Sequence, residues 1–454
     1  MRRGFIKGII GLPANLFYGI GIPACILVLD KENAPARKAV FMVDASRGFV
    51  KDGNKNRLRA QDMHKIVDAF TRQMDVPGFS RSVPLTEIEA NDYNLNLPRY
   101  IDSTEAEDVQ DISAHLQGGI PNRGVDALAP YWQVLPSVRA ALFEPSDRPG
   151  YSALSVPAAD VKAAILGHAE FATWTETVAQ RFAQWRAANV PLLKGLDVGA
   201  HPKELIDTLS ESLLLAFQAV PLLNAYDVYQ HLMTYWADTM QDDVYLVALD
   251  SWKATTGGVP NTDLIPSALV VARYFASDAQ AVAELEVKRD ALASQREELD
   301  EEHGGEDGLL AEARTESGKL TKASVNARLR AIASDPDAAE ENALLRSYRD
   351  LLDAEAEESR NMRDAQRALD AKVRAQYGRL SVDDVQTLVV DDKWLATLGA
   401  AVQGERERVS QGLAGRVRQL AERYAVPLPT LTCEVEVLAA RVDAHLHAMG
   451  ASWK

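Results

Sequence analysis

The sequence predicts an α/β segment followed by a mainly α-helical region that contains an antiparallel coiled-coil hairpin. In the first hundred residues, short apolar runs alternate with a helical pattern. Amphipathic segments separated by prolines fill most of the chain after that. Farther on, two long stretches rich in Ala, Glu, Leu and Arg flank a Gly-broken polar segment and carry apolar residues at 3–4 spacing, which is typical of paired helices.

The α/β segment begins with two apolar runs, residues 8–12 and 22–29, which are rich in branched side chains and bounded by Gly and Pro. Runs of this kind predict strands that are buried on both faces of a sheet covered by helices. A third run follows at 38–46. The next segment, 57–74, predicts a helix whose apolar residues are Leu58, Met63, Ile66, Val67 and Phe70.

The region from 103 to 278 predicts a series of helices with proline-punctuated joints. Residues 163–187 and 207–220 are amphipathic. Residues 225–252 place several tyrosines and tryptophans on one helix, and we expect a strand over the apolar run 244–249 at its end.

The predicted hairpin pairs a helix over 282–299 with one over 344–373. Arg289 and Arg296 occupy seam positions of the first helix, so the apolar seam is imperfect. The polar segment 303–308 allows the chain to leave the first helix, and a short helix follows. The seam residues are Val282, Leu285, Leu292 and Leu299, and then Leu344, Tyr348, Leu351, Met362, Ala365, Leu369 and Val373.

Residues 405–449 predict two further amphipathic helices around the turn 427–431. Two helices can each bury one apolar stripe against the other, but a wide stripe leaves apolar surface that marks an interaction site. The stripes are Val409, Leu413, Val417 and Leu420, and then Val435, Leu438, Val442 and Leu446.

Charge is unevenly distributed along the 454 residues. The net charge is −16, yet residues 1–100 hold 15 Lys and Arg against 10 Asp and Glu, which is +5 and leaves −21 for the rest. This asymmetry indicates either a nucleic-acid-facing part joined to an acidic scaffold or an ordinary solvated surface. The two cysteines, Cys25 and Cys433, form no disulfide framework and no zinc motif. With no apolar stretch long enough to span a bilayer, we expect a soluble, cytoplasmic protein.

Motifs that carry chemistry are scarce. The sequence has no GxGxxG, GxxxxGK[ST], HExxH or GxSxG pattern. Asp242 and Asp243 are adjacent, which points their side chains apart, so we expect no metal site there. Four histidines stand alone in the sequence, and we expect each of them to be solvent-facing or hydrogen-bonded: His64, His168, His201 and His231.

One stretch is specific, namely IIGLPANLFYGIGIPACILVLDK at residues 9–31. It resembles the late part of the catalytic domain in the DNA-methylating M subunit of type I restriction–modification systems. That family has an aromatic pair after a Leu-Pro strand, then Gly-x-Gly-x-Pro and a buried strand ending in Asn/Asp-Lys. The matching residues here are Leu12, Pro13, Phe17, Tyr18, Gly19, Gly21, Ile22, Pro23 and Lys31, whereas Ile20 stands where the family commonly has Thr. The resemblance continues at 40–49, 54–58 and 91–102.

The resemblance implies that residues 1–102 form the C-terminal part of a Rossmann-like methyltransferase sheet. It would be followed by a helical region at 103–278, the hairpin at 279–380 and a helical docking region at 381–454. In that family an Asn-Pro-Pro-aromatic tetrad holds a flipped adenine beside S-adenosylmethionine, and this sequence has no Asn-Pro-Pro. We therefore assign no catalytic residue and expect no bound cofactor on this chain alone. The expectation is that it is the C-terminal portion of a truncated or split methylase subunit.

The resemblance also gives the site residues and partners. Phe17 and Tyr18 are the candidates for stacking on a flipped base, or else they plug the edge of the sheet. Pro13, Gly19, Gly21 and Pro23 would set the loop geometry. The implied partners are DNA, a specificity subunit and a restriction subunit. Two hypotheses stay open: part of an adenine-specific DNA methyltransferase, inactive in isolation, or a non-catalytic module that docks a DNA-specificity partner.

Overall fold

The computed structural model describes residues 3–17, 19, 21–104, 109–305 and 308–450. Its described residues divide into two compact units. Unit 1 contains residues 1–193, 201–242 and 395–454, and unit 2 contains residues 194–200 and 243–394. Each unit is described separately below.

Unit 1 begins with a four-stranded mixed sheet in the order β2-β1-β3-β6. Strands β1 and β3 run parallel, and the outer strands run antiparallel to them. The four strands are β1 (Ile6–Gly11), β2 (Cys25–Leu29), β3 (Ala39–Asp44) and β6 (Ser80–Pro84). The predicted α/β segment is therefore present as a mixed sheet.

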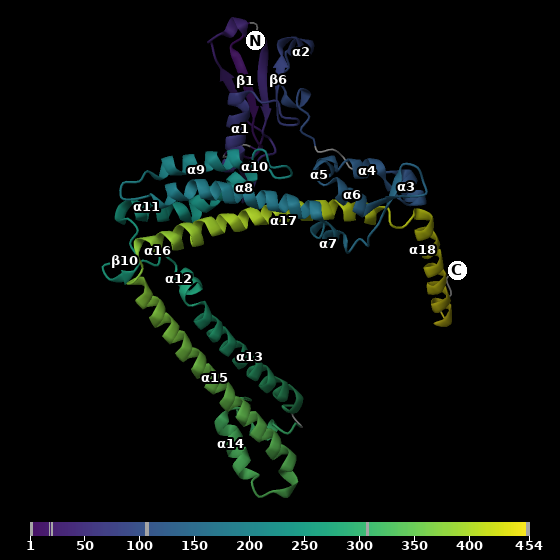
Figure 1. Cartoon of the computed structure of the whole chain (residues 1–454). Helices are drawn as coiled ribbons and strands as arrows, with labels where there is room; N and C mark the ends of the chain where they lie inside the picture. The colour runs from purple at the N-terminus through teal and green to yellow at the C-terminus, as the bar shows by residue number, and fades with distance from the viewer. Residues whose placement is uncertain (1–2, 18, 20, 105–108, 306–307, 451–454) are drawn as a thin grey trace. The chain divides into compact units, whose positions relative to one another are not determined.

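Both faces of the two central strands are covered. On one face Ile9 and Met42 pack against Ile88 and Tyr100, which follow β6. On the other face Ile10 and Phe41 pack against helix α1 (Ala60–Arg72), which Figure 1 shows beside the sheet. Alternate residues of a strand point to opposite faces, so two coverings explain why β1 and β3 are continuously apolar. The small elements nearby are β4 (Val50–Asp52), β5 (Lys55–Arg57), α2 (Leu85–Ala90) and the single 3-10 turns Ala34–Ala36 and Leu97–Arg99.

Strand β2 differs from the prediction of a strand buried on both faces. It lies at the edge of the sheet, and Ile26, Leu27 and Leu29 are 47%, 48% and 65% exposed. The prediction of a strand is therefore confirmed, but the prediction of its burial is wrong. Burial depends on which elements lie against the strand, and its own residues do not determine that. A long apolar edge of this kind is a surface on which further chain can pair.

The described residues of the helical part of unit 1 form small helices, a three-stranded sheet and five helices of eleven or more residues. Trp236–Met240 forms a π-helical turn after α10. The elements are α3 (Ile112–Gln117), β7 (Ile120–Pro121), α4 (Asn122–Asp126), α5 (Ala129–Val134), α6 (Pro136–Leu142), β8 (Phe143–Pro145), β9 (Tyr151–Leu154), α7 (Val161–Leu166), α8 (Ala169–Lys194), α9 (Pro202–Phe217), α10 (Ala225–Tyr235), α17 (Ala396–Arg423) and α18 (Leu428–Ala448).

The last two helices of unit 1 differ in the burial of their apolar stripes. In α17, Val409, Leu413, Val417 and Leu420 are all buried. In α18, Val435, Leu438 and Val442 are 64%, 56% and 56% exposed. The two predicted stripes therefore do not cover each other. The α17 stripe belongs to the core of unit 1, whereas the α18 stripe faces solvent.

Unit 2 is helical apart from one small hairpin. The run 244–249, which we expected to be a strand, lies inside helix α11 (Gln241–Asp250). Its branched residues favour a strand, but Val244 and Val247 are both fully buried at helical spacing, so tertiary packing decides the outcome. The other elements are β10 (Thr255–Thr256), β11 (Val259–Pro260), α12 (Ser267–Tyr274), α13 (Ala276–His303), α14 (Lys322–Ala331), α15 (Ala339–Tyr377), α16 (Val382–Gln386), the short 3-10 helices Ala311–Ala313 and Pro336–Ala338, and the π-helical segment Thr387–Leu395.

Helices α13 and α15 lie side by side and run antiparallel (Figure 1). Asp278, near the start of α13, pairs with Lys372, near the end of α15, at 2.7 Å. Farther along, Arg296 Nε donates to Glu355 Oε2 at 2.8 Å. The seam arginine Arg296 therefore has an acidic partner on the facing helix.

Candidate functional site

The candidate site lies where the parallel strands β1 and β3 end. In open α/β sheets, ligands bind outside the carboxyl ends of the strands, where several loops converge. The loop 12–24 leaves β1 at this edge and returns as β2. Its two ends are joined by a hydrogen bond from the Leu12 amide to the Ala24 carbonyl, at 2.8 Å. This loop carries the residues that the sequence singled out.

The β4–β5 hairpin holds the loop in place. The Asn56 side-chain amide donates to the Ala14 carbonyl at 2.7 Å, and its backbone amide donates to the Asn15 carbonyl at 3.0 Å. Lys55 Nζ donates to the Phe17 carbonyl at 3.2 Å. The sequence indicates residues 54–58 only through the family resemblance, because nothing local reveals which backbone a distant side chain will bind.

Of the two aromatic candidates, Phe17 is half-exposed, at 50%. Its side chain is therefore on the surface and is not buried in the packing of the sheet. Tyr18 lies outside the described residues. The role of Phe17 in base stacking stays a prediction.

The four residues expected to set the loop geometry differ in their surroundings. Gly19 has φ +75°, in the left-handed region where a side chain is strained. Pro13 is buried beside the end of β1, whereas Gly21 and Pro23 are exposed. Pro23 also lines a cavity that we call the carboxyl-edge cavity.

The carboxyl-edge cavity has a volume of about 590 Å³ and is lined by the ends of β1 and β3, the start of β2 and two later segments, 95–98 and 101–104. Asp44, the last residue of β3, is buried at its wall. Its carboxylate accepts hydrogen bonds from the Ser46 amide at 3.1 Å and from the Ser103 hydroxyl at 2.7 Å. These bonds fix Asp44 as a structural acceptor that ties residue 103 to the sheet edge.

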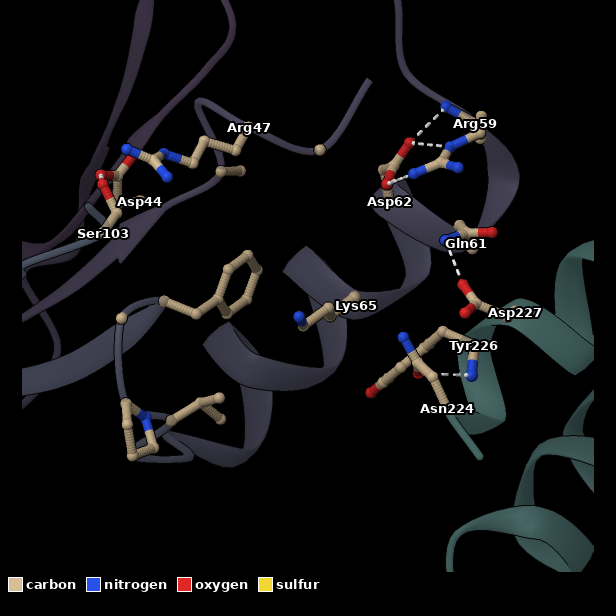
Figure 2. Close-up of a pocket in the computed structure, with 16 residues that line it drawn as sticks. Asp44, Arg47, Arg59, Gln61, Asp62, Lys65, Ser103, Asn224, Tyr226 and Asp227 are labelled. Atoms are coloured by element: carbon tan, nitrogen blue, oxygen red, sulfur yellow. Dashed lines mark hydrogen bonds and ion pairs between the residues drawn. The ribbon is translucent and has the colours of Figure 1, made fainter. Parts of the chain in front are cut away.

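A second cavity, of about 400 Å³, lies between the sheet edge and the first turns of α1 and α10 (Figure 2). We call it the α1–α10 cavity. It shares Asp44, Arg47 and Ser103 with the carboxyl-edge cavity. Its remaining lining residues are Ala45, Gly48, Arg59, Gln61, Asp62, Lys65, Val76, Pro77, Gly78, Phe79, Asn224, Tyr226 and Asp227.

Polar contacts join α1 to α9 and α10 behind this cavity. Gln61 donates its side-chain amide to Asp227 at 2.9 Å, and the Tyr226 hydroxyl donates to Asp68 at 2.9 Å. Burial, followed by the hydrogen bond to Asp68, raises the pKa of Tyr226 well above its usual range. His64 Nε2 lies 2.6 Å from Glu211 Oε1, so the expectation that this histidine is hydrogen-bonded is confirmed. These contacts join α1 to α9 and α10.

The described residues contain no group of three His, Cys, Asp or Glu side chains that could hold a metal ion. Asp242 is exposed, while Asp243 is buried and accepts from Lys393 Nζ at 2.8 Å and from Trp394 Nε1 at 2.7 Å. The two neighbouring carboxylates therefore point apart, as expected. Within the described part of the chain, no helix is long and apolar enough to cross a membrane.

This sheet edge and its loop lie in the part of the chain that is similar to known proteins. Residues 1–109 match the family described as N-6 DNA Methylase. The recognition from the sequence is therefore confirmed.

The similar curated proteins are methylase subunits of type I restriction enzymes. The chain is 36% identical over 121 residues to the MjaVII subunit of Methanocaldococcus jannaschii, a match that covers 26% of this chain and 21% of the relative. It is 34% identical over 110 residues to the MpnII subunit of Mycoplasma pneumoniae, covering 24% and 20%. The chain thus spans about a fifth of the length of these relatives.

Among solved structures, the chain is similar to the type I restriction-modification system methyltransferase subunit from Streptococcus thermophilus. The identity is 37%, over 22% of this chain and 21% of that chain, with a TM-score of 0.21.

Proposed function

We propose that this chain is the C-terminal part of the methyltransferase subunit of a type I restriction–modification system, which transfers a methyl group from S-adenosylmethionine to adenine N6 in DNA. The observation that carries the proposal is the loop 12–24 at the carboxyl edge of the sheet, in the segment that matches the N-6 DNA methylase family. The partners are DNA, a specificity subunit and a restriction subunit.

The role of the loop follows from the chemistry of adenine methylation. The N6 amine inside a duplex is unreachable, so the base is extruded at a cost of a few kcal/mol. An exposed aromatic ring can offset part of this cost, because base–aromatic stacking contributes about 1–3 kcal/mol per base. Phe17, half-exposed on a loop tethered by Asn56 and Lys55, is suited to this, and Tyr18 is the adjacent candidate.

S-adenosylmethionine supplies the methyl group in this proposal. The carboxyl-edge cavity has apolar walls from β1 and residues 95–101 beside polar groups of Asn96, Ser103 and Thr104. These residues fit a wall of a nucleoside pocket. They do not include an Asn-Pro-Pro-aromatic tetrad, so the polar clamp on the adenine amine is assigned to no residue of this chain.

The helical regions serve assembly in this proposal. Helix α18 presents an exposed apolar stripe, which we assign to docking on the helical spacers of the specificity subunit. The α13–α15 pair is assigned as a coiled-coil arm. Its seam residues on α13, from Val282 to Leu299, are half-buried against α15.

The test uses the methyltransferase that contains this chain, assembled with its specificity subunit. Phe17→Ala should lower N6-methyladenine formation about tenfold and change the 2-aminopurine fluorescence of a probe at the target base, because it removes base–aromatic stacking of about 1–3 kcal/mol. Ile22→Ala, which removes an exposed aliphatic side chain from the same loop, is the matched control and should change neither. Full methylation by Phe17→Ala would contradict the stacking role. An assembly that holds the specificity subunit but never methylates DNA would favour the non-catalytic docking module instead.

A further inference from the structure

The cations that line the α1–α10 cavity differ in whether a carboxylate neutralises them. Three cations and three carboxylates line it. Arg59 is bound to Asp62 through two side-chain hydrogen bonds of 2.9 Å, so these two charges offset each other. Asp227 accepts from Arg408, which lies outside the lining, at 2.9 Å. Arg408 also pairs with Glu405 at 2.6 Å, so Asp227 keeps part of its negative charge. Arg47 and Lys65 are the lining cations that form no ion pair among the described residues.

Lys65 is the more unusual of these two cations. Its ammonium group lies 4.2 Å from the centroid of the Phe79 ring, and it forms no ion pair with a carboxylate among the described residues. Burial lowers the pKa of Lys65, although the nearby carboxylates of Asp227 and Asp62 oppose this effect. A half-buried ammonium without a carboxylate partner is stabilised by an anion that enters the cavity.

Arg47 stands on the opposite wall, on the turn after β3. It is exposed and makes no hydrogen bond or ion pair within the described part of the chain. A guanidinium group can bind a phosphate through two parallel N–H donors, which gives both geometry and energy. Figure 2 shows Lys65 in the middle of the cavity, with the first turn of α10 on one side and Arg47 on the other, its side chain extending toward Asp44 and Ser103.

Two helix starts add to the field. The first turns of α1 and α10, thirteen and eleven residues long, both line the cavity, and each helix start carries a partial positive charge. Their first amides are occupied, because Gln61 N donates to Gln230 and Tyr226 N donates to Asn224. The helix starts therefore contribute only their electrostatic potential, and the hydrogen bonds to an anion must come from side chains.

We propose that the α1–α10 cavity binds a phosphate group between Lys65 and Arg47, and that a backbone phosphate of duplex DNA supplies it. The choice of DNA rests on the proposed function and on the +5 charge of residues 1–100, in which both cations lie. The rim residues Arg47, Pro77, Gly78 and Asn224 are exposed, so the cavity is reachable from solvent. A contact of this kind positions the duplex without reading its sequence.

The first arm of the test examines the anion site without DNA. Inorganic phosphate is titrated into the full chain and followed by 31P NMR, with Lys65→Gln, Arg47→Gln and Lys65→Arg as variants. We expect Lys65→Gln and Arg47→Gln each to weaken phosphate binding at least fivefold and Lys65→Arg to retain it. Lys162→Gln, at an exposed position of α7, is the matched control. Unchanged phosphate binding in both Gln variants overturns the site.

The second arm identifies the source of the phosphate. Duplex binding by the assembled methyltransferase is measured by fluorescence anisotropy from 50 to 200 mM KCl. Each Gln variant should lower the slope of log K against log salt by about 1, equally for specific and unrelated duplexes. If the Gln variants lose phosphate but keep the duplex affinity and slope, the DNA assignment is overturned. If the unsubstituted assembly binds no duplex, the proposed function fails, and the first arm still decides whether the anion site exists.

Discussion

The side-chain amide of Asn56 donates to the carbonyl of Ala14 at 2.7 Å, across 42 residues of sequence. This bond ties the β4–β5 hairpin to the loop that carries Phe17. A loop that presents an aromatic ring to a substrate needs such support, because its apolar contacts are few. The position of the Phe17 ring thus depends on Asn56, to which we assign no catalytic role.

Replacing Asn56 by Ala should loosen the loop without unfolding the sheet. One lost hydrogen bond contributes about 1 kcal/mol, so amide hydrogen exchange over residues 12–24 should become about fivefold faster. Mass-spectrometric exchange on the full chain measures this. Asn54→Ala, at the exposed turn of the same hairpin, should leave these rates unchanged. Equal protection in both variants would show that the backbone bond from Asn56 to Asn15 suffices.

The exposed stripe of α18 predicts the effect of two added carboxylates. Leu438→Asp with Val442→Asp should abolish co-purification with the specificity subunit and leave the circular dichroism spectrum unchanged, because neither residue is in the core. Ala440→Asp with Ala444→Asp adds the same charge to the other side of the helix and should preserve co-purification. Retained binding by the first pair would place the docking surface elsewhere.

The α13–α15 pair predicts crosslinks within one molecule. In a Cys25→Ser, Cys433→Ser background, cysteines at Arg296 and Glu355 should be joined intramolecularly by a short bis-maleimide, because these side chains meet at 2.8 Å. A mismatched pair at Asp278 and Glu355 serves as the control and should remain unjoined. Products of twice the chain mass would instead indicate a homodimeric coil.

Substitution of Asp243 should cause a large loss of unfolding free energy. Asp243→Ala leaves Lys393, whose side chain is 11% exposed, without its buried carboxylate, and we expect a loss of about 3 kcal/mol in unfolding free energy. Urea unfolding followed by tryptophan fluorescence reports it through Trp394, which also binds Asp243. Asp242→Ala, at the exposed neighbour, should lie within about 0.5 kcal/mol of the unsubstituted chain.

S-adenosylmethionine should not bind this chain in isolation, because the sequence contains no Asn-Pro-Pro-aromatic tetrad and no Gly-rich donor loop of the family type. Isothermal titration calorimetry on the purified chain measures this directly. A dissociation constant in the micromolar range would contradict the assignment to the C-terminal part of a methylase subunit.

The sequence by itself indicated the family resemblance, three strands and one helix of the first hundred residues, and the two long helices around 282–299 and 344–373. These features depend on local pattern: the Leu-Pro strand with its aromatic and glycine loop, and apolar residues at 3–4 spacing in 282–299 and 344–373. The helix at 57–74 was predicted in the same way and is observed as α1. Period and loop chemistry are properties of neighbouring residues, so a single sequence contains them.

Only the tertiary structure decided burial and long-range contact. Leu27 on β2 and Leu438 on α18 look like core residues in the sequence, yet both are exposed because no described element covers them. The run 244–249 has the composition of a strand but is helical, since Val244 and Val247 pack into a helical core. The α1–α10 cavity joins Arg47, Lys65 and Asn224, which no local pattern relates, because a cavity is formed by segments that only folding brings together.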